Sequence, residues 1–227
     1  MKVLKSFIAA SAVSLAALAP TASQAAIMLT LDDLSTVGVD VTVTDGGPGD
    51  ASGPGVITFI GPLGAWTVNV STGVSNAVLP RFGIDLNSIN VSSGFAGTLR
   101  ISFTETGMVH PGVGPLVLNG HGEIGGTIGS GGNVAYSFYI DDSDAPFGTG
   151  ATVFSGATGV SPFADSGSSY VNVTNPFSMT LVMDITHSTL GGSTSFDFEG
   201  RVPEPGSLAL LGIALLGAGA VTRRRKI

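Results

Sequence analysis

The sequence predicts an all-β fold, a β-sandwich or jelly roll, between an N-terminal signal helix and a single C-terminal transmembrane helix. Between residues 26 and 201, apolar residues recur at every second position in several stretches, as in strands that bury one face. Clusters of Gly, Pro and Asp separate these stretches and favour turns. No segment between them resembles the helical crossover that parallel strands require. The regular alternation favours a packed sandwich over disorder, although the chain contains 34 Gly.

Five stretches show the alternation most clearly, and each is expected to form a strand. They are residues 37–43, 66–70, 99–103, 134–140 and 179–185. In the last of them, Val182 is the one apolar residue on the second face. With the weaker patterns between them, the middle of the chain is expected to form roughly eight to eleven short strands, which suits a sandwich.

Residues 1–25 have the layout of a secretory signal peptide. Two lysines precede an apolar run at 7–18, and Ser23 and Ala25 are the small residues expected three and one positions before the cleaved bond. Export through the Sec translocon, with cleavage after Ala25, is therefore expected. A retained membrane anchor is the alternative, but the run is shorter than the ~20 residues of a stable span.

Residues 202–227 consist of three successive parts. The prolines of Pro203-Glu204-Pro205 keep the chain extended, because each fixes its own φ and biases the preceding residue away from helix. Residues 208–221 are apolar and uncharged, and are just long enough to span the inner membrane. A basic cluster follows, made of Arg223, Arg224, Arg225 and Lys226. By the positive-inside rule this cluster stops on the cytoplasmic side, so the globular part is expected outside the cytoplasm.

The order and spacing of these three parts resemble the PEP-CTERM sorting signal of Gram-negative bacteria. The resemblance covers residues 202–226 and implies a substrate of exosortase, a membrane protease that cuts near the Pro-Glu-Pro motif and sends the protein outward. Many similar proteins are linked to extracellular polysaccharide and biofilm. The same tail is also labelled an ice-binding protein C-terminal domain, which implies nothing about the attached domain. An ordinary single-span anchor is the alternative.

The charge of the middle region excludes one class of partner. Residues 26–201 hold three arginines, no lysine and fifteen acidic residues, a net charge of −12. Such a surface repels phosphate backbones, so no nucleic-acid partner is expected. The chain has no Cys, which rules out disulfides and thiolate metal sites.

Two pairs of side chains could support acid–base chemistry. His121 and Glu123 lie two residues apart and would share a face if they lie in a strand. Asp197 and Glu199 alternate with phenylalanines and are also expected on one strand face. A glycosidase needs two carboxylates about 5–9 Å apart across a cleft. Solvated polar strand faces are the more ordinary interpretation of both pairs, and no catalytic residue is assigned.

A cluster of three acidic residues and three aromatic side chains offers other binding sites. Asp141, Asp142 and Asp144 lie in a loop after an expected strand, where oxygen ligands could hold calcium, although a polar turn explains them equally. Sugar stacking needs exposed aromatic rings, and the candidates are Tyr139, Tyr170 and Phe147.

The function expected from the sequence is that of an exported, exosortase-sorted protein of the cell surface or extracellular matrix. Its role in the envelope, exopolysaccharide or biofilm is expected to be structural or adhesive, with no enzymatic activity. A carbohydrate-binding module and a surface hydrolase are the alternatives.

Overall fold

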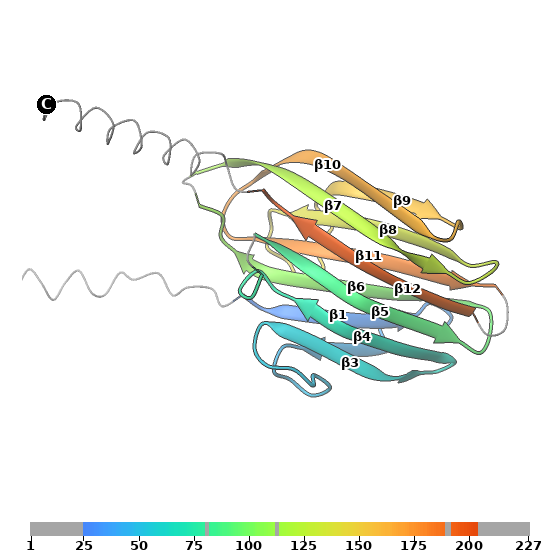
Figure 1. Cartoon of the computed structure of the whole chain (residues 1–227). Coiled ribbons are helices and arrows are strands. Elements are labelled where there is room, and N and C mark those ends of the chain that lie inside the picture. Colours follow the sequence, from blue (N-terminus) through green and yellow to red (C-terminus); the bar gives the residue numbers. More distant parts are fainter. Residues whose placement is uncertain (1–24, 80–81, 112–113, 189–191, 204–227) are drawn as a thin grey trace, which may run out of the picture.

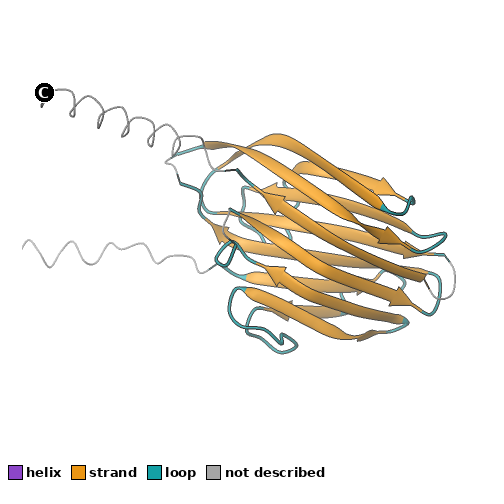
Figure 2. Ribbon diagram, in the orientation of Figure 1, coloured by secondary structure: helices purple, strands orange, loops and turns teal. Residues whose placement is uncertain are grey.

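The computed structural model describes residues 25–79, 82–111, 114–188 and 192–203, and all regular secondary structure in these residues is β-strand (Figure 2). Twelve strands in these residues form two antiparallel sheets of six strands each (Figure 1). This confirms the all-β prediction with two antiparallel sheets. Within the same residues there is no helix with the length and hydropathy of a membrane span. The expected signal helix and the expected span at 208–221 lie outside the described residues.

The two sheets are called sheet A and sheet B. In spatial order, sheet A comprises β2 (Val41–Thr44), β1 (Ile27–Asp33), β6 (Gly97–Met108), β11 (Phe177–His187), β8 (Asn133–Asp141) and β9 (Ala151–Thr158). Sheet B comprises β10 (Phe163–Val173), β7 (Leu116–Ile128), β12 (Gly192–Arg201), β5 (Gly83–Ser93), β4 (Trp66–Val74) and β3 (Val56–Leu63).

The eight strands from β5 to β12 have the connectivity of a jelly roll. Sheet B orders its four as β10-β7-β12-β5 and sheet A orders its four as β6-β11-β8-β9. Consecutive strands therefore cross from one sheet to the other at every step except the β8–β9 hairpin. β1 and β2 extend sheet A beyond β6, and β3 and β4 extend sheet B beyond β5.

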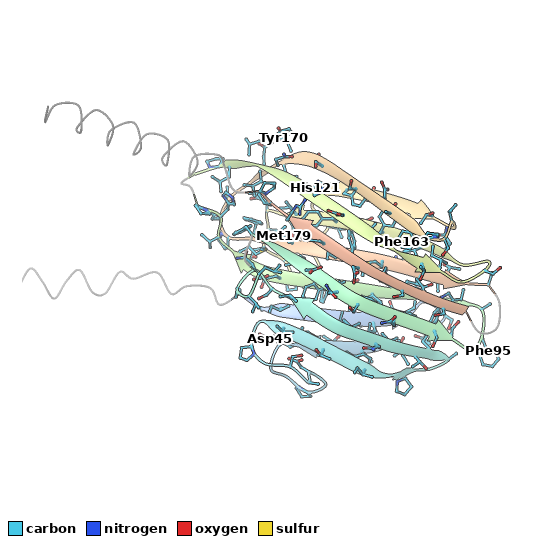
Figure 3. All side chains as sticks on the ribbon, viewed as in Figure 1. Asp45, Phe95, His121, Phe163, Tyr170 and Met179 are labelled. Atoms are coloured by element: carbon cyan, nitrogen blue, oxygen red, sulfur yellow. The ribbon has the colours of Figure 1, made fainter. Side chains whose placement is uncertain are left out.

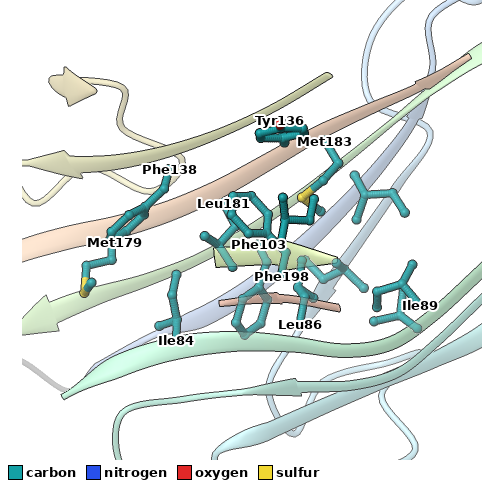
Figure 4. Packing of buried hydrophobic residues seen from close by; sticks show 14 of the residues in the cluster. Ile84, Leu86, Ile89, Phe103, Tyr136, Phe138, Met179, Leu181, Met183 and Phe198 are labelled. Carbon is teal, nitrogen blue, oxygen red and sulfur yellow. The ribbon is translucent and has the colours of Figure 1, made fainter. Parts of the chain in front are cut away.

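The core lies between the sheets and is built from the alternating residues of both. Leu181 and Phe103 of sheet A meet Phe198 and Leu86 of sheet B, and all four side chains are fully buried (Figure 4). Trp66 is also buried, as its place in an alternating stretch predicts. Each Å² of apolar surface buried stabilises the fold by about 25 cal/mol, so this layer is the main source of stability.

Four of the five predicted strands are confirmed, and the first is half wrong. Residues 66–70, 99–103, 134–140 and 179–185 lie in β4, β6, β8 and β11. Of residues 37–43, however, only the part from Val41 onward is in a strand, and Val37 is fully exposed in the preceding loop. There, Asp40 accepts hydrogen bonds from the Asp33 N–H at 2.7 Å and from the Thr36 hydroxyl at 3.0 Å, which holds a turn. Twelve strands also exceed the eight to eleven expected.

The last strand of the described residues lies in the middle of sheet B. β12 pairs with β5 on one side and with β7 on the other. After Arg201, Val202 remains buried, and its N–H donates to the carbonyl of Phe82 at 2.9 Å. Pro203 is then exposed. The folded domain therefore ends one residue before the Pro-Glu-Pro segment.

Candidate functional site

Three carboxylates stand side by side on the outer face of sheet B. In the strand register Glu199 of β12 lies opposite Asp85 of β5 and opposite Glu123 of β7. Side chains directly opposite each other on antiparallel strands have Cβ atoms about 4.5–5.5 Å apart, and like charges in such pairs are destabilising. We call Asp85, Glu199 and Glu123 the acidic row. An arrangement with this electrostatic cost is a candidate for a binding function.

Two basic side chains adjoin one end of the acidic row. Arg201 places its guanidinium nitrogens 3.8 Å from Glu123 Oε2 and 3.5 Å from Glu199 Oε1. His121 Nε2 lies 3.8 Å from the same Glu123 oxygen, and His121 Nδ1 lies 2.8 Å from Ser168 Oγ. Because Arg201 is partly exposed, it offsets the repulsion within the row only modestly and leaves its charge accessible to a ligand.

A shallow cavity of about 390 Å³ opens over the acidic row. Asp85, Asn87, Glu123, Asp197 and Glu199 supply its polar lining. Asp197 also accepts a hydrogen bond from the backbone N–H of Ser88, which fixes its carboxylate at the rim. The cavity thus presents oxygen acceptors from three neighbouring strands to the solvent.

The structure joins two pairs that the sequence presents separately. Asp197 and Glu199 share the outer face of β12, as their spacing predicts, and His121 and Glu123 share the outer face of β7. Sequence reasoning missed Asp85, which completes the row. The buried Ile84 and Leu86 on either side of it are the signal that could have placed it on the outer face.

Of the three predicted aromatic candidates, Tyr170 is the exposed one. It lies on the outer face of β10 at 75% exposure, two residues from Ser168, the ladder partner of His121. Figure 3 shows Tyr170 and His121 over the same pair of strands. Tyr139 and Phe147 are half-buried and line a separate cavity of about 350 Å³ on the outer face of sheet A.

The carboxylates of Asp141, Asp142 and Asp144 point to three different partners. Asp141 accepts from the Ser143 hydroxyl, Asp142 from the hydroxyl of Thr174 at 2.8 Å, and Asp144 from the Gly107 N–H at 2.7 Å. These contacts fix the loop after β8 to neighbouring segments. In the part of the chain that the structure describes, no three His, Asp or Glu side chains form a group that could hold a metal ion. Calcium binding here stays a prediction.

A serine–histidine pair is buried between the sheets. Ser93 Oγ donates to the carbonyl of Phe95 at 2.9 Å and accepts from His187 Nδ1 at 2.8 Å. His187 Nε2 then accepts from Thr194 Oγ1 at 2.9 Å, and its ring lies 5.1 Å from that of Trp66. With 2% of its surface exposed, His187 is a core residue that cannot reach a substrate. Burial lowers its pKa below the ordinary value.

This buried histidine should make the protein less stable in acid. Because the pKa of His187 is lower in the folded state than the ~6.5 of an unfolded chain, the unfolded state binds more protons below that pH. The free energy of unfolding contributed by neutral His187 is therefore complete above about pH 6.5 and is lost as the pH falls. Urea unfolding of the protein and of His187→Gln at pH 5 to 8 should show the difference between them shrinking in acid. His121→Gln, on the outer face of sheet B, is the control, and an equal pH slope in His187→Gln would contradict the assignment.

The sorting residues predicted from the sequence lie at or beyond the ends of the described chain. Ala25 and Pro203 are both exposed at these ends. Ser23, Glu204, Pro205 and the basic cluster Arg223, Arg224, Arg225 and Lys226 lie outside the described residues.

Comparison with known proteins identifies the tail. Residues 201–226 match the family model described as the PEP-CTERM protein-sorting motif. No curated protein matches the chain significantly. Among solved structures, the chain is similar to the enzymatically active domain of tailspike protein 4 from bacteriophage CBA120, at 11% identity and a TM-score of 0.33, over 65% of this chain and 19% of that one. From Arg201, the last residue of its last strand, the chain thus carries the sorting motif of PEP-CTERM proteins.

Proposed function

We propose that this protein is an exported, exosortase-sorted component of the cell surface or extracellular matrix with a structural or adhesive role, exerted by binding extracellular polysaccharide on the outer face of sheet B. The sorting motif implies export and a membrane-anchored intermediate that exosortase recognises. The exposed ring of Tyr170 on the same sheet face as the acidic row carries the polysaccharide part of the proposal.

The arrangement suits a sugar chain lying across the strands. An exposed tyrosine ring offers an apolar face for stacking against the C–H groups of a pyranose. The carboxylates of Glu199, Asp85 and Asp197 accept hydrogen bonds from hydroxyl groups, and such charge-assisted bonds are stronger than neutral ones. Arg201 adds donors at the end of the row. The polar lining and shallow form of the cavity favour an extended polymer over a small apolar ligand.

Binding to polysaccharide from the native host is the direct test. We expect Tyr170→Ala to weaken binding about tenfold, or ~1.4 kcal/mol, since truncating an exposed aromatic anchor removes its stacking area. Glu199→Gln should weaken binding similarly, because the neutral amide accepts weaker hydrogen bonds. Phe95→Ala removes an exposed aromatic ring at the β5–β6 turn, away from this face, and should leave affinity unchanged. Equal affinity in all four proteins would contradict the proposal.

A surface hydrolase is the second candidate, favoured by the direct opposition of Glu199 and Glu123. A Cβ separation of about 4.5–5.5 Å is compatible with the carboxylate spacing of ~5–5.5 Å in retaining glycosidases. Arg201 contacts both carboxylates, which suits two permanent anions better than an acid that must donate a proton. Release of reducing ends from the polysaccharide, abolished in both Glu123→Gln and Glu199→Gln, would establish the hydrolase in place of the binding protein.

A further inference from the structure

A third cavity, of about 420 Å³, lies where the described chain enters sheet A. Ile27 begins β1 and faces Glu105 of β6 in the register, while the N–H of Asp45 donates to the Ile27 carbonyl at 3.1 Å. Asp45 and Glu105 therefore flank Ile27 from its two sides, and both line the cavity together with Ala25. Figure 3 shows Asp45 and Met179, the other ladder partner of Glu105, at this end of the sandwich.

Glu105 is the most buried carboxyl side chain at this end, and no cation among the described residues compensates its charge. It is 2% exposed, and its Oε2 accepts one hydrogen bond, from the Asn76 N–H at 2.8 Å. Among the described residues, no Arg or His lies within ion-pair distance of it. Burial raises the pKa of Glu105 to about 7, against the lowering effect of the Asn76 N–H. A buried carboxylate without a counter-ion is destabilising, so the site favours a cation.

Asp45 adds an oxygen atom that accepts no hydrogen bond. Its Oδ2 accepts from the Gly55 N–H at 2.9 Å, whereas its Oδ1 is buried and has no hydrogen-bond partner. Buried polar atoms in folded proteins are nearly always paired, so an orphaned carboxylate oxygen beside a cavity indicates a missing donor. Pro54, Ala77 and Val78 supply an apolar lining, which strengthens any charge interaction inside.

Strand pairing fixes the backbone nitrogen of Ala26 between Ala25 and Ile27, the two neighbours that line this cavity. The Ala26 N–H donates to Thr106 Oγ1 at 3.4 Å, and the Thr106 N–H donates to the Ala26 carbonyl at 3.0 Å. Ala25, the residue expected to precede the cleaved bond, lines the cavity itself. Hydrolysis of the Ala25–Ala26 bond consumes one water and leaves a carboxylate on Ala25 and an ammonium group on Ala26.

We propose that the α-ammonium group of the processed N-terminus occupies this cavity, where it forms an ion pair with Glu105 and donates a hydrogen bond to Asp45. Departure of Ala25 makes room for the group, which can donate one hydrogen bond to the unpaired Asp45 Oδ1 and place its charge beside Glu105. The charge of Glu105 is then compensated in the mature protein and left uncompensated in the precursor. Signal-peptide removal thus completes the packing at the end of sheet A where β1 begins.

The lysine distribution makes this group easy to observe. The chain has three lysines, at positions 2, 5 and 226, so a mature protein that lacks residues 1–25 has at most one amine besides the α-amine. Reductive methylation with ¹³C-formaldehyde therefore labels the α-amine and, if the tail is kept, Lys226, which titrates near 10.4. The α-amine of the protein secreted by its host can then be titrated by NMR.

We expect this α-amine to titrate at least about one pH unit above the ordinary 7.7–8.0, because an opposite charge within ~4–6 Å favours the charged form. Glu105→Gln, which keeps an acceptor for the Asn76 N–H, should return the pKa of the α-amine to the ordinary range. Asp45→Asn should lower this pKa part of the way. Glu123→Gln is the control: it makes an equal change of charge on the outer face of sheet B and should leave the pKa of the α-amine raised. An ordinary titration in the unaltered protein would overturn the proposal, as would N-terminal sequencing that places the first residue elsewhere. The measurement on unaltered protein decides the question even where Glu105→Gln does not fold.

Discussion

Replacing Phe198 by alanine is expected to lower the free energy of unfolding by about 3–5 kcal/mol, the range for buried phenylalanines truncated to alanine. Phe198 is fully buried on β12, and its ring lies 6.2 Å from that of Tyr136 and 6.4 Å from that of Phe154, both edge-on. These partners come from the opposite sheet, so the cavity left by the substitution lies between the sheets. Since small domains are stable by only about 5–15 kcal/mol, much of the total would be lost.

Urea unfolding of the secreted protein measures this loss directly. Phe95→Ala is the matched control, since Phe95 is 65% exposed and its truncation should change the free energy of unfolding by less than about 0.5 kcal/mol. A loss below about 1 kcal/mol in Phe198→Ala would contradict the packing described for the core.

Replacing Pro203 and Pro205 together by alanine is expected to reduce the amount of released protein at least about tenfold. A protease site that recognises particular side chains strongly rejects a substrate that lacks them. Each proline fixes its own φ and keeps the preceding residue extended, and alanine removes both constraints. The fold supports this, because Val202 is still held by its hydrogen bond to Phe82, whereas Pro203 is exposed to a protease.

Intact mass and location of the protein in its native host, with and without exosortase, give the readout. The altered protein should stay in the membrane fraction at the mass that includes Arg223 to Lys226, as the unaltered protein should in a host without exosortase. Pro115→Ala, at an exposed loop proline, is the control and should be released normally. Release that depends on neither the prolines nor exosortase would leave an ordinary tail anchor.

Strands could be predicted from the alternation of apolar residues wherever one face of the strand is buried. The prediction was wrong where local hydrogen bonds form a turn instead. Residues 134–140 and 179–185 form strands because every second side chain enters the core. Val37 and Val39 keep the same spacing, but the turn that Asp40 holds leads them into solvent. Periodicity measures only the pattern and carries no information on what lies opposite, so it cannot distinguish these cases.

The acidic row could not be predicted from the sequence for the same reason: periodicity does not tell which strands pair. The sequence places Asp197 with Glu199, and His121 with Glu123, because two-residue spacing within one strand fixes the face. Joining these pairs, and adding Asp85, requires that β12 lie between β7 and β5 in a particular register. Pairing of strands more than sixty residues apart depends on the whole packed core, and no local pattern encodes it.

The central position of β12 also bears on the order of events during export. In the export that the sorting motif implies, β5 and β7 cross the membrane before residues 192–201, and neither has its final neighbour on that side until β12 arrives. The structure therefore places the closing step of sheet B near the end of translocation, when little more than the tail remains inside. Folding dominated by such distant pairings is generally slow, so we expect the earlier strands to cross the membrane before the sheet closes. The tail can then hold the newly closed domain at the membrane surface until exosortase acts.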